Sequence, residues 1–483
     1  YVTSNINGIE VDTSITDTVN LDFMINNITL RPRRENKILG VRIDWEPDAQ
    51  HIPESYQVYR SESETGEYVI KGEGSNLSYF DVLNESEMGS TLYYYILAVF
   101  NNSLTNVDLA EKNEIDIRFT VPGSYSTIQE SINSSIDGDA DYGDIIYVKD
   151  GIYMENIDFK GKAIILRSEN GPENTIIDGS SDDVVVRIDS GEDENSIFYG
   201  FTIRNGLDNK GGGIYIDESS PIIQNCILEN NSANINGGGI YMNNSFAIID
   251  SCSIQDNIAV QNGGGIYIED STPMIKNCTI QRNNSVNGGG IYYINMEIED
   301  YELYLEGSEL SSNNASAYGG GMHIEIGYPE MLLCNFFNNS ASEGGAIYIN
   351  DQDNWNGDQG LCDFQRCKFE NNAAYNGGAL FLNKQTQSYL QNCIIIKNES
   401  TSSLAGGGGI FIKDSYLDID HCTFSRNQTN DLPGGSILIL SVLYIPTVII
   451  TNSIIWNDDA SSNIEEQNDG SFEGEWELDI TYS

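Results

Sequence analysis

The sequence predicts an all-β protein in which an N-terminal β-sandwich precedes a parallel β-helix solenoid. Two observations lead to this prediction. Short runs of alternating apolar and polar residues fill positions 20–118, and a repeat of about 26 residues fills most of the remainder. The 47 Gly and only 10 Pro among 483 residues fit strands joined by many tight turns. We expect an N-terminal extension over residues 1–19, the sandwich over 20–118 and the solenoid over 119–483.

Residues 20–118 alternate apolar and polar side chains along short runs, as half-buried strands do. Roughly seven such strands in about 100 residues are typical of a β-sandwich. The segment resembles a fibronectin type III module, and the resemblance implies a spacer or docking role. The residues that carry it are Ile43-Asp44-Trp45, Tyr56–Arg60, Tyr79-Phe80-Asp81 and Tyr93-Tyr94-Tyr95. The polar, β-prone extension before it is expected to pair with a sheet edge, its own or a neighbour's.

A Gly-Gly-(Gly/Ala/Ser)-apolar motif defines the repeat. Its apolar residues are Ile214, Ile240, Ile266, Ile291, Met322, Ile347, Leu380, Ile410 and Ile437, spaced by 26, 26, 25, 31, 25, 33, 30 and 27 residues. Units of about 26 residues without helical periodicity predict one β-helix coil each, roughly a dozen in all. Equivalent positions then stack about 4.8 Å apart.

Two further positions recur in register with the glycines. A small residue occupies Cys226, Cys252, Cys278, Ser308, Cys334, Cys367, Cys393 and Cys422. Five residues after each stands an asparagine: Asn231, Asn257, Asn283, Asn313, Asn339, Asn372, Asn398 and Asn427. We expect a buried cysteine ladder and an asparagine ladder along one turn, where Asn tolerates left-handed backbone.

The stacked cysteines allow two interpretations. Stacking brings their Cα atoms within disulfide range. Serine takes the same position at Ser308 and Ser453, which favours reduced cysteines that only pack. Cys362 lies outside the register, and Cys367 is its one local candidate partner.

The solenoid's two ends carry their own signals. A capping box at Thr127 and Glu130, with Ile128, Ile132 and Ile136 on one face, predicts a capping helix over residues 126–136. The final residues, 478–483, look like a strand of another coil, so we expect the natural chain to continue beyond them.

The solenoid resembles the right-handed parallel β-helix, or pectin-lyase-like, superfamily. The residues that carry this are Thr127–Glu130, Gly143–Val148 and Gly151–Ile157. Gly344–Ile347 and the Phe-x-x-Asn pairs also resemble the passenger repeat of polymorphic outer-membrane proteins. These pairs are Phe336/Asn339, Phe369/Asn372 and Phe424/Asn427. The resemblance implies a secreted or cell-surface protein.

The net charge of −49 comes from 73 Asp and Glu against 24 Lys and Arg. It excludes nucleic acid and anionic membrane surfaces as partners, because phosphates would be repelled. No apolar run is long enough for a membrane-spanning helix. The chain starts at Tyr1, which we interpret as an N-terminus left by removal of a secretory signal.

In most coils an aromatic residue directly follows the apolar residue of the glycine motif, as Tyr215 follows Ile214. The strip comprises Tyr215, Tyr241, Tyr267, Tyr292, His323, Tyr348, Phe381, Phe411 and Leu438. Because the flanking isoleucines point into the coil, we expect these side chains to point outward over roughly 40 Å. Such a strip exceeds the apolar patch of a soluble monomer, so we expect a neighbouring subunit, the N-terminal module or a glycan to cover it. The alternative is a structural ladder of stacked rings, with His323 as a surface member.

An acidic loop is the candidate metal site. Asp137, Asp139, Asp141 and Asp144 resemble a calcium loop, although the Gly and Glu of an EF-hand loop are missing. No cofactor is required by any motif, and Ca²⁺ is the one ion that this loop suggests. The alternative is a solvated acidic insertion.

These observations favour an extracellular, non-enzymatic structural or adhesive protein that associates with copies of itself, other surface proteins or glycans. The rival is a polysaccharide lyase or glycoside hydrolase with an accessory module. Polygalacturonase-type members of the superfamily use a Gly-His-Gly and an Arg-x-Lys motif, and neither occurs here. Only paired carboxylates at Asp182-Asp183 and Asp458-Asp459 are present, so no enzyme motif is complete.

Overall fold

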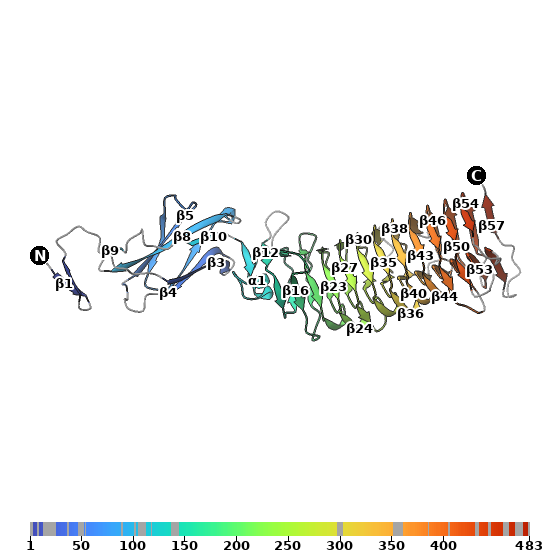
Figure 1. The fold of residues 1–483 in the computed structure, drawn as a ribbon, viewed down its shortest axis with the longest axis horizontal. Coiled ribbons are helices and arrows are strands. Elements are labelled where there is room, and N and C mark those ends of the chain that lie inside the picture. The colour runs from blue at the N-terminus through green and yellow to red at the C-terminus, as the bar shows by residue number, and fades with distance from the viewer. Residues whose placement is uncertain are drawn as a thin grey trace. The chain divides into compact units, whose positions relative to one another are not determined.

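The computed structural model divides the chain into two compact units, Tyr1–Ser126 and Thr127–Ser483. The structure describes residues 3–6, 9–12, 26–35, 38–46, 53, 55–87, 90–100, 103–104, 113–116, 118–136, 144–296, 303–350, 361–384, 386–403, 406–429, 434–442, 446–456, 463–468 and 477–481. Figure 1 shows their strands and the helix and labels some of them.

The N-terminal unit consists of antiparallel sheets. A hairpin joins β1 (Thr3–Ile6) to β2 (Ile9–Asp12), so the extension pairs with itself. One sheet has the order β3 (Asn26–Glu35), β4 (Ile38–Glu46), β7 (Ser78–Val82). The other has the order β10 (Asn113–Asp116), β8 (Thr91–Phe100), β5 (Ser55–Ser61), β6 (Val69–Gly74), with β9 (Ser103–Leu104) beside β8. A 3₁₀ turn, η1 (Glu85–Glu87), and β11 (Phe119–Val121) complete the unit.

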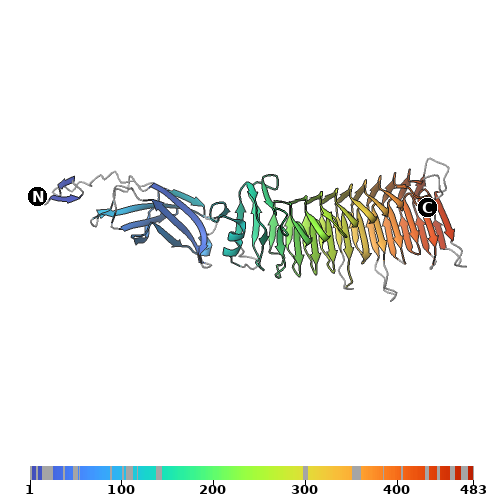
Figure 2. The same ribbon diagram turned by 90° about the horizontal axis from the view of Figure 1, so that it is seen from below.

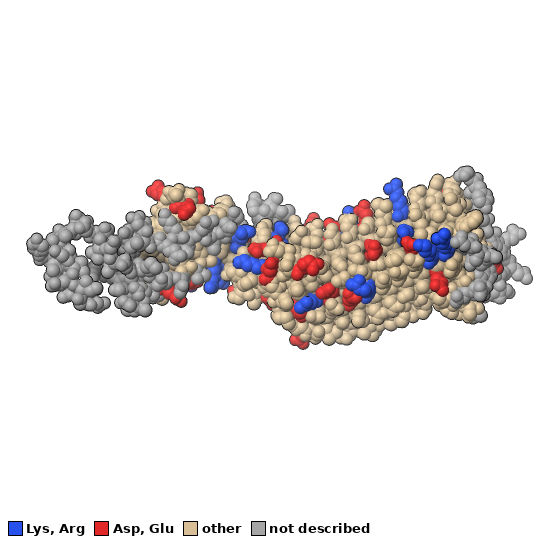
Figure 3. Space-filling view, viewed as in Figure 1, with Lys and Arg blue, Asp and Glu red and all other residues tan. Residues whose placement is uncertain are grey.

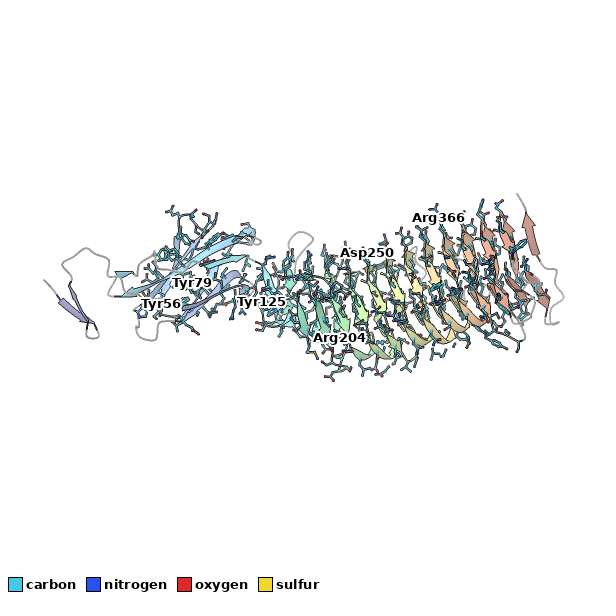
Figure 4. The ribbon with its side chains drawn as sticks, viewed as in Figure 1. Tyr56, Tyr79, Tyr125, Arg204, Asp250 and Arg366 are labelled. Carbon is cyan, nitrogen blue, oxygen red and sulfur yellow. The ribbon has the colours of Figure 1, made fainter. Side chains whose placement is uncertain are left out.

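Alternating apolar residues of these strands form its core. Val41, Ile43 and Tyr94 are fully buried. The Tyr56 ring meets the Trp45 ring edge-on, with centroids 5.3 Å apart, and Tyr56 is labelled in Figure 4.

The short helix α1 (Ile128–Ser134) opens the second unit and lies within the predicted range. Thr127 is its N-cap, and the Thr127 hydroxyl accepts a hydrogen bond of 3.0 Å from the Glu130 amide. Ile128 and Ile132 are buried. The Glu155 carboxylate accepts the first two free helix amides, from Ile128 at 3.1 Å and Gln129 at 3.0 Å.

The rest of the second unit is a right-handed parallel β-helix of about twelve coils, seen from two sides in Figures 1 and 2. This confirms the predicted solenoid. A full coil contains four strands, and each pairs in parallel with the equivalent strand of the next coil. We number the four resulting sheets I to IV.

The strands of each sheet follow in chain order. Sheet I contains β12 (Ile145–Val148), β15 (Ile165–Ser168), β18 (Ile197–Tyr199), β22 (Ile222–Gln224), β26 (Ile248–Asp250), β30 (Met274–Lys276), β34 (Tyr304–Glu306), β38 (Glu330–Leu332), β42 (Cys362–Gln365), β46 (Gln387–Gln391), β50 (Tyr416–Asp420), β54 (Thr447–Thr451) and β57 (Glu477–Thr481). Sheet II contains β13 (Gly151–Tyr153), β16 (Thr175–Asp178), β19 (Thr202–Arg204), β23 (Ile227–Glu229), β27 (Ser253–Gln255), β31 (Thr279–Gln281), β35 (Glu309–Ser311), β39 (Asn335–Phe337), β43 (Lys368–Glu370), β47 (Ile394–Ile396), β51 (Thr423–Ser425) and β55 (Ile454–Trp456).

The strands of sheet III follow the glycine motif in the chain, and the strands of sheet IV precede it. Sheet III contains β14 (Ile157–Asp158), β17 (Val186–Ile188), β21 (Ile214–Asp217), β25 (Ile240–Asn243), β29 (Ile266–Glu269), β33 (Ile291–Ile294), β37 (Met322–Ile326), β41 (Ile347–Asn350), β45 (Leu380–Asn383), β49 (Ile410–Lys413), β53 (Ile437–Ser441) and β56 (Ile464–Asn468). Sheet IV contains β20 (Leu207–Lys210), β24 (Ser232–Asn236), β28 (Ile258–Ala259), β32 (Asn284–Asn287), β36 (Asn314–Tyr318), β40 (Ser340–Glu343), β44 (Ala373–Asn376), β48 (Glu399–Ser400) and β52 (Gln428–Thr429).

A glycine turn carries the chain from sheet IV to sheet III. Gly237 has a φ of 70°, in the left-handed region that favours glycine. A Cβ there would lie 2.5 Å from the Ile240 carbonyl oxygen, so the turn has no room for a side chain. This tight turn sets the two sheets beside each other in every regular coil.

The cysteine ladder lies inside the coils. All eight cysteines are free and buried. The Cys226 amide donates to Cys252 Sγ at 3.5 Å, and Ser308 accepts the equivalent bond from Cys278 at 3.1 Å. A small side chain that accepts one amide bond therefore satisfies this position, and Cys and Ser both do so.

The asparagine ladder is fully buried from Asn231 to Asn427. The Asn231 side chain and amide both donate to Asn257 Oδ1, at 3.1 and 3.0 Å. In this turn Asn230, the residue before Asn231, has the left-handed backbone, with a φ of 56°. The expectation that the ladder asparagine itself is left-handed is therefore wrong: its side-chain hydrogen bonds are what the position requires.

Candidate functional site

The aromatic ladder occupies sheet III on the side opposite the buried isoleucines. The rings of Tyr215, Tyr241, Tyr267 and Tyr292 stack with centroids 5.2–5.3 Å apart and interplanar angles of 4–6°. Only 1% of Tyr241 and 8% of Tyr292 is exposed. The ring planes are nearly parallel, so each inner ring has both faces covered by its neighbours.

The prediction of an exposed strip that needs a partner to cover it is therefore wrong. Two effects that alternation alone does not reveal bury the rings: they cover each other, and sheet IV lies beside their edges across the glycine turn. Tyr348, Phe381, Phe411 and Leu438 form a second buried cluster farther along the ladder. Replacing Tyr241, Tyr267 and Tyr292 by Ser would remove three rings from the core, so we expect it to destabilise the fold.

His323 divides the ladder into these two clusters. Its ring stands edge-on to Tyr292 and Tyr348, with interplanar angles of 76° and 87°. His323 is 2% exposed, so it is a core residue and not the surface member that we expected. The imidazole is smaller than a phenol ring, and at this point the continuous stack ends.

Glu325 is the charged neighbour of His323. His323 Nε2 lies 3.0 Å from Glu325 Oε2, but the contact is poorly aligned, and neither ring nitrogen has a hydrogen-bond partner in the described structure. Burial lowers the pKa of His323, and this outweighs the opposing effect of Glu325. Burial by itself would raise the pKa of Glu325. The interactions with His323 and with Asn350, whose Nδ2 donates to the carboxylate at 3.0 Å, outweigh burial, so the pKa of Glu325 is lowered overall. At neutral pH the pair is a neutral imidazole beside a carboxylate.

A polar series in sheet IV runs beside the ladder and ends in the same place. Asn262 donates to Asn236 Oδ1 at 3.1 Å, and Asn287 donates to Asn262 Oδ1 at 2.8 Å. Tyr318 takes the next position, since it pairs with Asn287. Asn287 Oδ1 is consequently buried without a hydrogen-bond partner among the described residues.

A cavity of about 410 Å³ opens where both series break. It is lined by Gln261, Asn262, Val286, Asn287, Tyr292, Tyr318, His323 and Glu325. The break falls in the coil with the 31-residue spacing, where the strand register also shifts by a β-bulge. The cavity combines aromatic rings, a carboxylate and buried polar atoms without partners, which is the composition of a binding site.

The predicted calcium loop is largely outside the described residues, which include only Asp144 of its four aspartates. Asp144 is buried, and its Oδ2 accepts a bond of 3.0 Å from the Ile136 amide. In the described part of the chain, no group of three or more His, Cys, Asp or Glu is placed to hold a metal ion. Figure 3 shows acidic and basic side chains scattered over the visible β-helix surface rather than gathered in one patch.

The carboxylates considered for catalysis do not converge in the described structure. Asp183 Oδ1 accepts from its neighbour's amide at 2.7 Å and lies 3.4 Å from Arg187. Asp458 and Asp459 lie outside the described residues. Arg204 is paired with Asp178 at 2.8 Å, and Figure 4 places it on the opposite side of the β-helix from Asp250.

Comparisons with known proteins agree with this fold. The profile of the family described as the right handed beta helix region matches residues 162–327. The Chlamydia polymorphic membrane protein repeat matches residues 333–350. The structure therefore shows a right-handed parallel β-helix fold, and residues 333–350 are similar to the polymorphic membrane protein repeat. No curated protein sequence matches it.

Three solved structures are similar to it. Geobacillus virus E2 ORF18 is 11% identical with a TM-score of 0.29, over 77% of this chain and 66% of that one. Rice weevil pectin methyl esterase is 12% identical with a TM-score of 0.26, over 73% and 89%. The catalytic unit of the GH87 alpha-1,3-glucanase of Streptomyces thermodiastaticus is 11% identical with a TM-score of 0.30, over 97% of both chains. These values are too low to transfer an activity to this chain.

No helix in the described part of the chain is long and apolar enough to cross a membrane.

The sequence analysis did not predict the cavity, although the sequence contains a signal for it. The position before the glycines reads Lys210, Asn236, Asn262, Asn287 and Tyr318 in successive coils. When this position is aligned with the aromatic position of the same coils, the asparagine series and the tyrosine series are both interrupted in one coil, at Tyr318 and His323.

Proposed function

We propose that this chain is an extracellular, non-enzymatic surface protein that assembles with copies of itself into a filament or surface layer. The observation that carries the proposal is the polymorphic-membrane-type repeat at residues 333–350, which lies within an unbroken asparagine ladder. Asn313 bonds to Asn339 and Asn339 to Asn372, at 3.1 and 3.0 Å, so the repeat is one regular coil among others.

The regularity of the coils supports a structural role. Each ladder asparagine is held by neighbours above and below, and the stacked rings add a second series that is interrupted at His323. Such a solenoid is stabilised coil by coil and resists bending, which suits a spacer or the subunit of an assembly. The net charge of −49 favours solubility outside the cell and disfavours nucleic acid as a partner.

The N-terminal unit is proposed to act as a fibronectin type III-like docking module. Its two antiparallel sheets, β3-β4-β7 and β10-β8-β5-β6, support this assignment. In this proposal the module supplies contacts to surface partners or glycans.

The test combines localisation with assembly. Antibody labelling of intact cells is expected to reach the protein, and protease added outside is expected to remove the label. Electron microscopy of the purified chain over a concentration series is expected to show filaments or sheets. A protein that is protected inside the cell, or monomeric at every concentration, would overturn the proposal.

Non-enzymatic character is tested separately. The purified chain is incubated with a panel of acidic and neutral polysaccharides, and new reducing or unsaturated ends are measured. We expect none above a heat-treated control. Turnover that disappears in a Glu325→Gln variant would replace this proposal with an enzyme whose site is the cavity.

A further inference from the structure

The groove beside the aromatic ladder already holds one ammonium group, that of Lys210. Lys210 Nζ donates to the Tyr241 hydroxyl at 2.7 Å and lies 4.5 Å from the centre of the Tyr241 ring. The same hydroxyl donates to Glu269 Oε2 at 2.7 Å. A chain of hydrogen bonds from an ammonium through a tyrosine hydroxyl to a carboxylate is a stable arrangement for a partly buried charge.

The cavity repeats this arrangement two coils farther on, without the lysine. Lys210 pairs with Asn236, and Asn236 with Asn262, so Asn262 stands where the lysine would be. Tyr241 is followed by Tyr267 and then Tyr292 in the stack.

The carboxylate is repeated as well. Glu269 and Glu325 both stand three residues after the first apolar residue that follows the glycines, Ile266 and Met322. The β-bulge in β37 accommodates Glu325 beside a strand that has Ile294 instead of an acid. The hydroxyl of Tyr292 has none of the hydrogen bonds that Tyr241 makes, although both tyrosines are buried.

The unpaired atoms around the cavity are mainly acceptors. A neutral His323 that turns its Nε2 proton toward Glu325 keeps a lone pair on Nδ1, which has no partner in the described structure. Asn287 Oδ1 is a second buried acceptor without a partner there. Unsatisfied buried acceptors are costly, so a ligand that supplies several N–H donors would be favoured.

We propose that this cavity binds a primary ammonium ion in the place equivalent to that of Lys210 Nζ. An –NH₃⁺ group has three donors and a positive charge, which match the Glu325 carboxylate, the polar acceptors and the Tyr292 hydroxyl. The volume of about 410 Å³ leaves room for an alkyl chain behind the charged group. A neutral hydroxyl ligand would gain the hydrogen bonds but not the attraction to the Glu325 carboxylate.

The chemistry fits either a free amine or a lysine side chain of another protein. Butylammonium is the probe for the first source, and Nα-acetyl-lysine methylamide for the second. Binding to the full-length protein is followed by calorimetry at pH 7.5, with n-butanol as the uncharged control. We expect both ammonium probes to bind at one site and butanol to bind at least about tenfold more weakly, the value of one charged hydrogen bond. If only butylammonium binds, the ligand is a free amine.

Three variants test the location of the site. Asn262→Lys places the chain's own ammonium in the cavity, as at Lys210, and is expected to abolish probe binding. Val260→Lys adds the same charge at a residue that is 58% exposed, and is expected to leave binding unchanged. Lys210→Met empties the earlier place and is expected to raise the number of bound probes from one to two.

Circular dichroism and melting of each variant show that the fold is kept. Equal binding of butanol and butylammonium would overturn the proposal and leave an apolar slot. Binding that survives Asn262→Lys as well as it survives Val260→Lys would place the probe elsewhere. Absence of any saturable binding by the wild-type chain would mean that only water fills the cavity.

Discussion

Asn283 Oδ1 accepts two hydrogen bonds from Asn257, one from its amide and one from its side chain, at 3.0 and 3.1 Å. Asn283 in turn donates its own Nδ2 to the Ile254 carbonyl at 2.8 Å. One side chain therefore connects three points of the neighbouring coil, and no water competes because the residue is fully buried.

Asn283→Ala is expected to lower the free energy of unfolding by about 3 kcal/mol, because it leaves buried donors and a carbonyl without partners. Asn234→Ala, at an exposed position of β24, is the control and is expected to change it by less than about 0.5 kcal/mol. Urea unfolding followed by circular dichroism measures both. Equal effects of the two substitutions would show that the ladder adds no stability.

The aromatic ladder offers a test in which only a hydroxyl changes. Tyr241→Phe removes the group that links Lys210 to Glu269, and we expect a loss of about 1–2 kcal/mol. Tyr267→Phe keeps the stack and breaks no hydrogen bond of the Tyr267 hydroxyl to another described residue, so stability should hardly change. Thermal unfolding compares the two variants. Similar losses in both would assign the effect to ring packing instead of the hydroxyl network.

His323 predicts a loss of stability in mild acid. Its pKa in the folded protein is lowered by burial, below the ordinary value of 6.5, so the unfolded chain binds the proton more readily. The stabilising effect of the neutral imidazole is complete above pH 6.5 and declines as the pH falls below it. The lowered pKa of Glu325 acts in the same direction at lower pH. Tyr292 and Tyr348, which also meet this ring, stay neutral throughout that range because burial raises the pKa of both hydroxyls.

His323→Phe restores the aromatic side chain that the neighbouring coils have at this position. We expect the variant to lose less stability than the wild type between pH 7 and pH 5. Melting temperatures at the two pH values measure this, and His421→Phe is the control because its side chain is 57% exposed. An unchanged pH dependence in His323→Phe would show that other groups cause the acid sensitivity.

Sequence periodicity predicted the β-helix well because each coil repeats the same requirements. The glycines, Cys226 and Asn231 each perform a task that recurs in the next coil, so spacing alone aligns them. The burial of Tyr241 could not be obtained in this way. Alternation gives the direction of a side chain within its strand, but cover by sheet IV depends on how sharply the glycine turn folds the coil.

The candidate site follows from an interruption of the repeat. His323 in an aromatic position was visible in the sequence, and so was Tyr318 in a series of asparagines. Their combined effect is a cavity beside which Asn287 Oδ1 and the His323 ring nitrogens have no hydrogen-bond partner among the described residues. It depends on relative positions across two sheets. Sequence reasoning that treats one position at a time does not bring these residues together.

Calcium is expected to raise the stability of the second unit through the acidic loop that ends at Asp144, or through the acidic turns after the sheet III strands. The reason is the net charge of −49, because a bound divalent ion relieves repulsion between neighbouring carboxylates. The melting temperature in millimolar CaCl₂ is compared with that in NaCl of equal ionic strength. An equal melting temperature in both salts would leave only general screening.

The last prediction concerns Asp81, which is 3% exposed in the core of the N-terminal unit. Its Oδ2 accepts from the Tyr94 hydroxyl at 2.8 Å and from Arg60 at 2.9 Å. Asp81→Ala removes one of the two carboxylates that pair with the largely buried Arg60 in the described structure and leaves Glu87 at 3.1 Å. We expect this unit to lose about 3–4 kcal/mol of stability, as breaking a buried ion pair typically does.

The two units are compact by themselves, so the loss should be confined to the first of them. Hydrogen exchange measured by mass spectrometry is expected to speed up in β5 and β8 of the Asp81→Ala variant and to stay unchanged in β23 to β25. Asp44→Ala is the matched control, because the Asp44 side chain is 39% exposed and lies 3.5 Å from Arg42, a surface pair worth about 1 kcal/mol or less. Faster exchange throughout the β-helix of Asp81→Ala would mean that the two units unfold together.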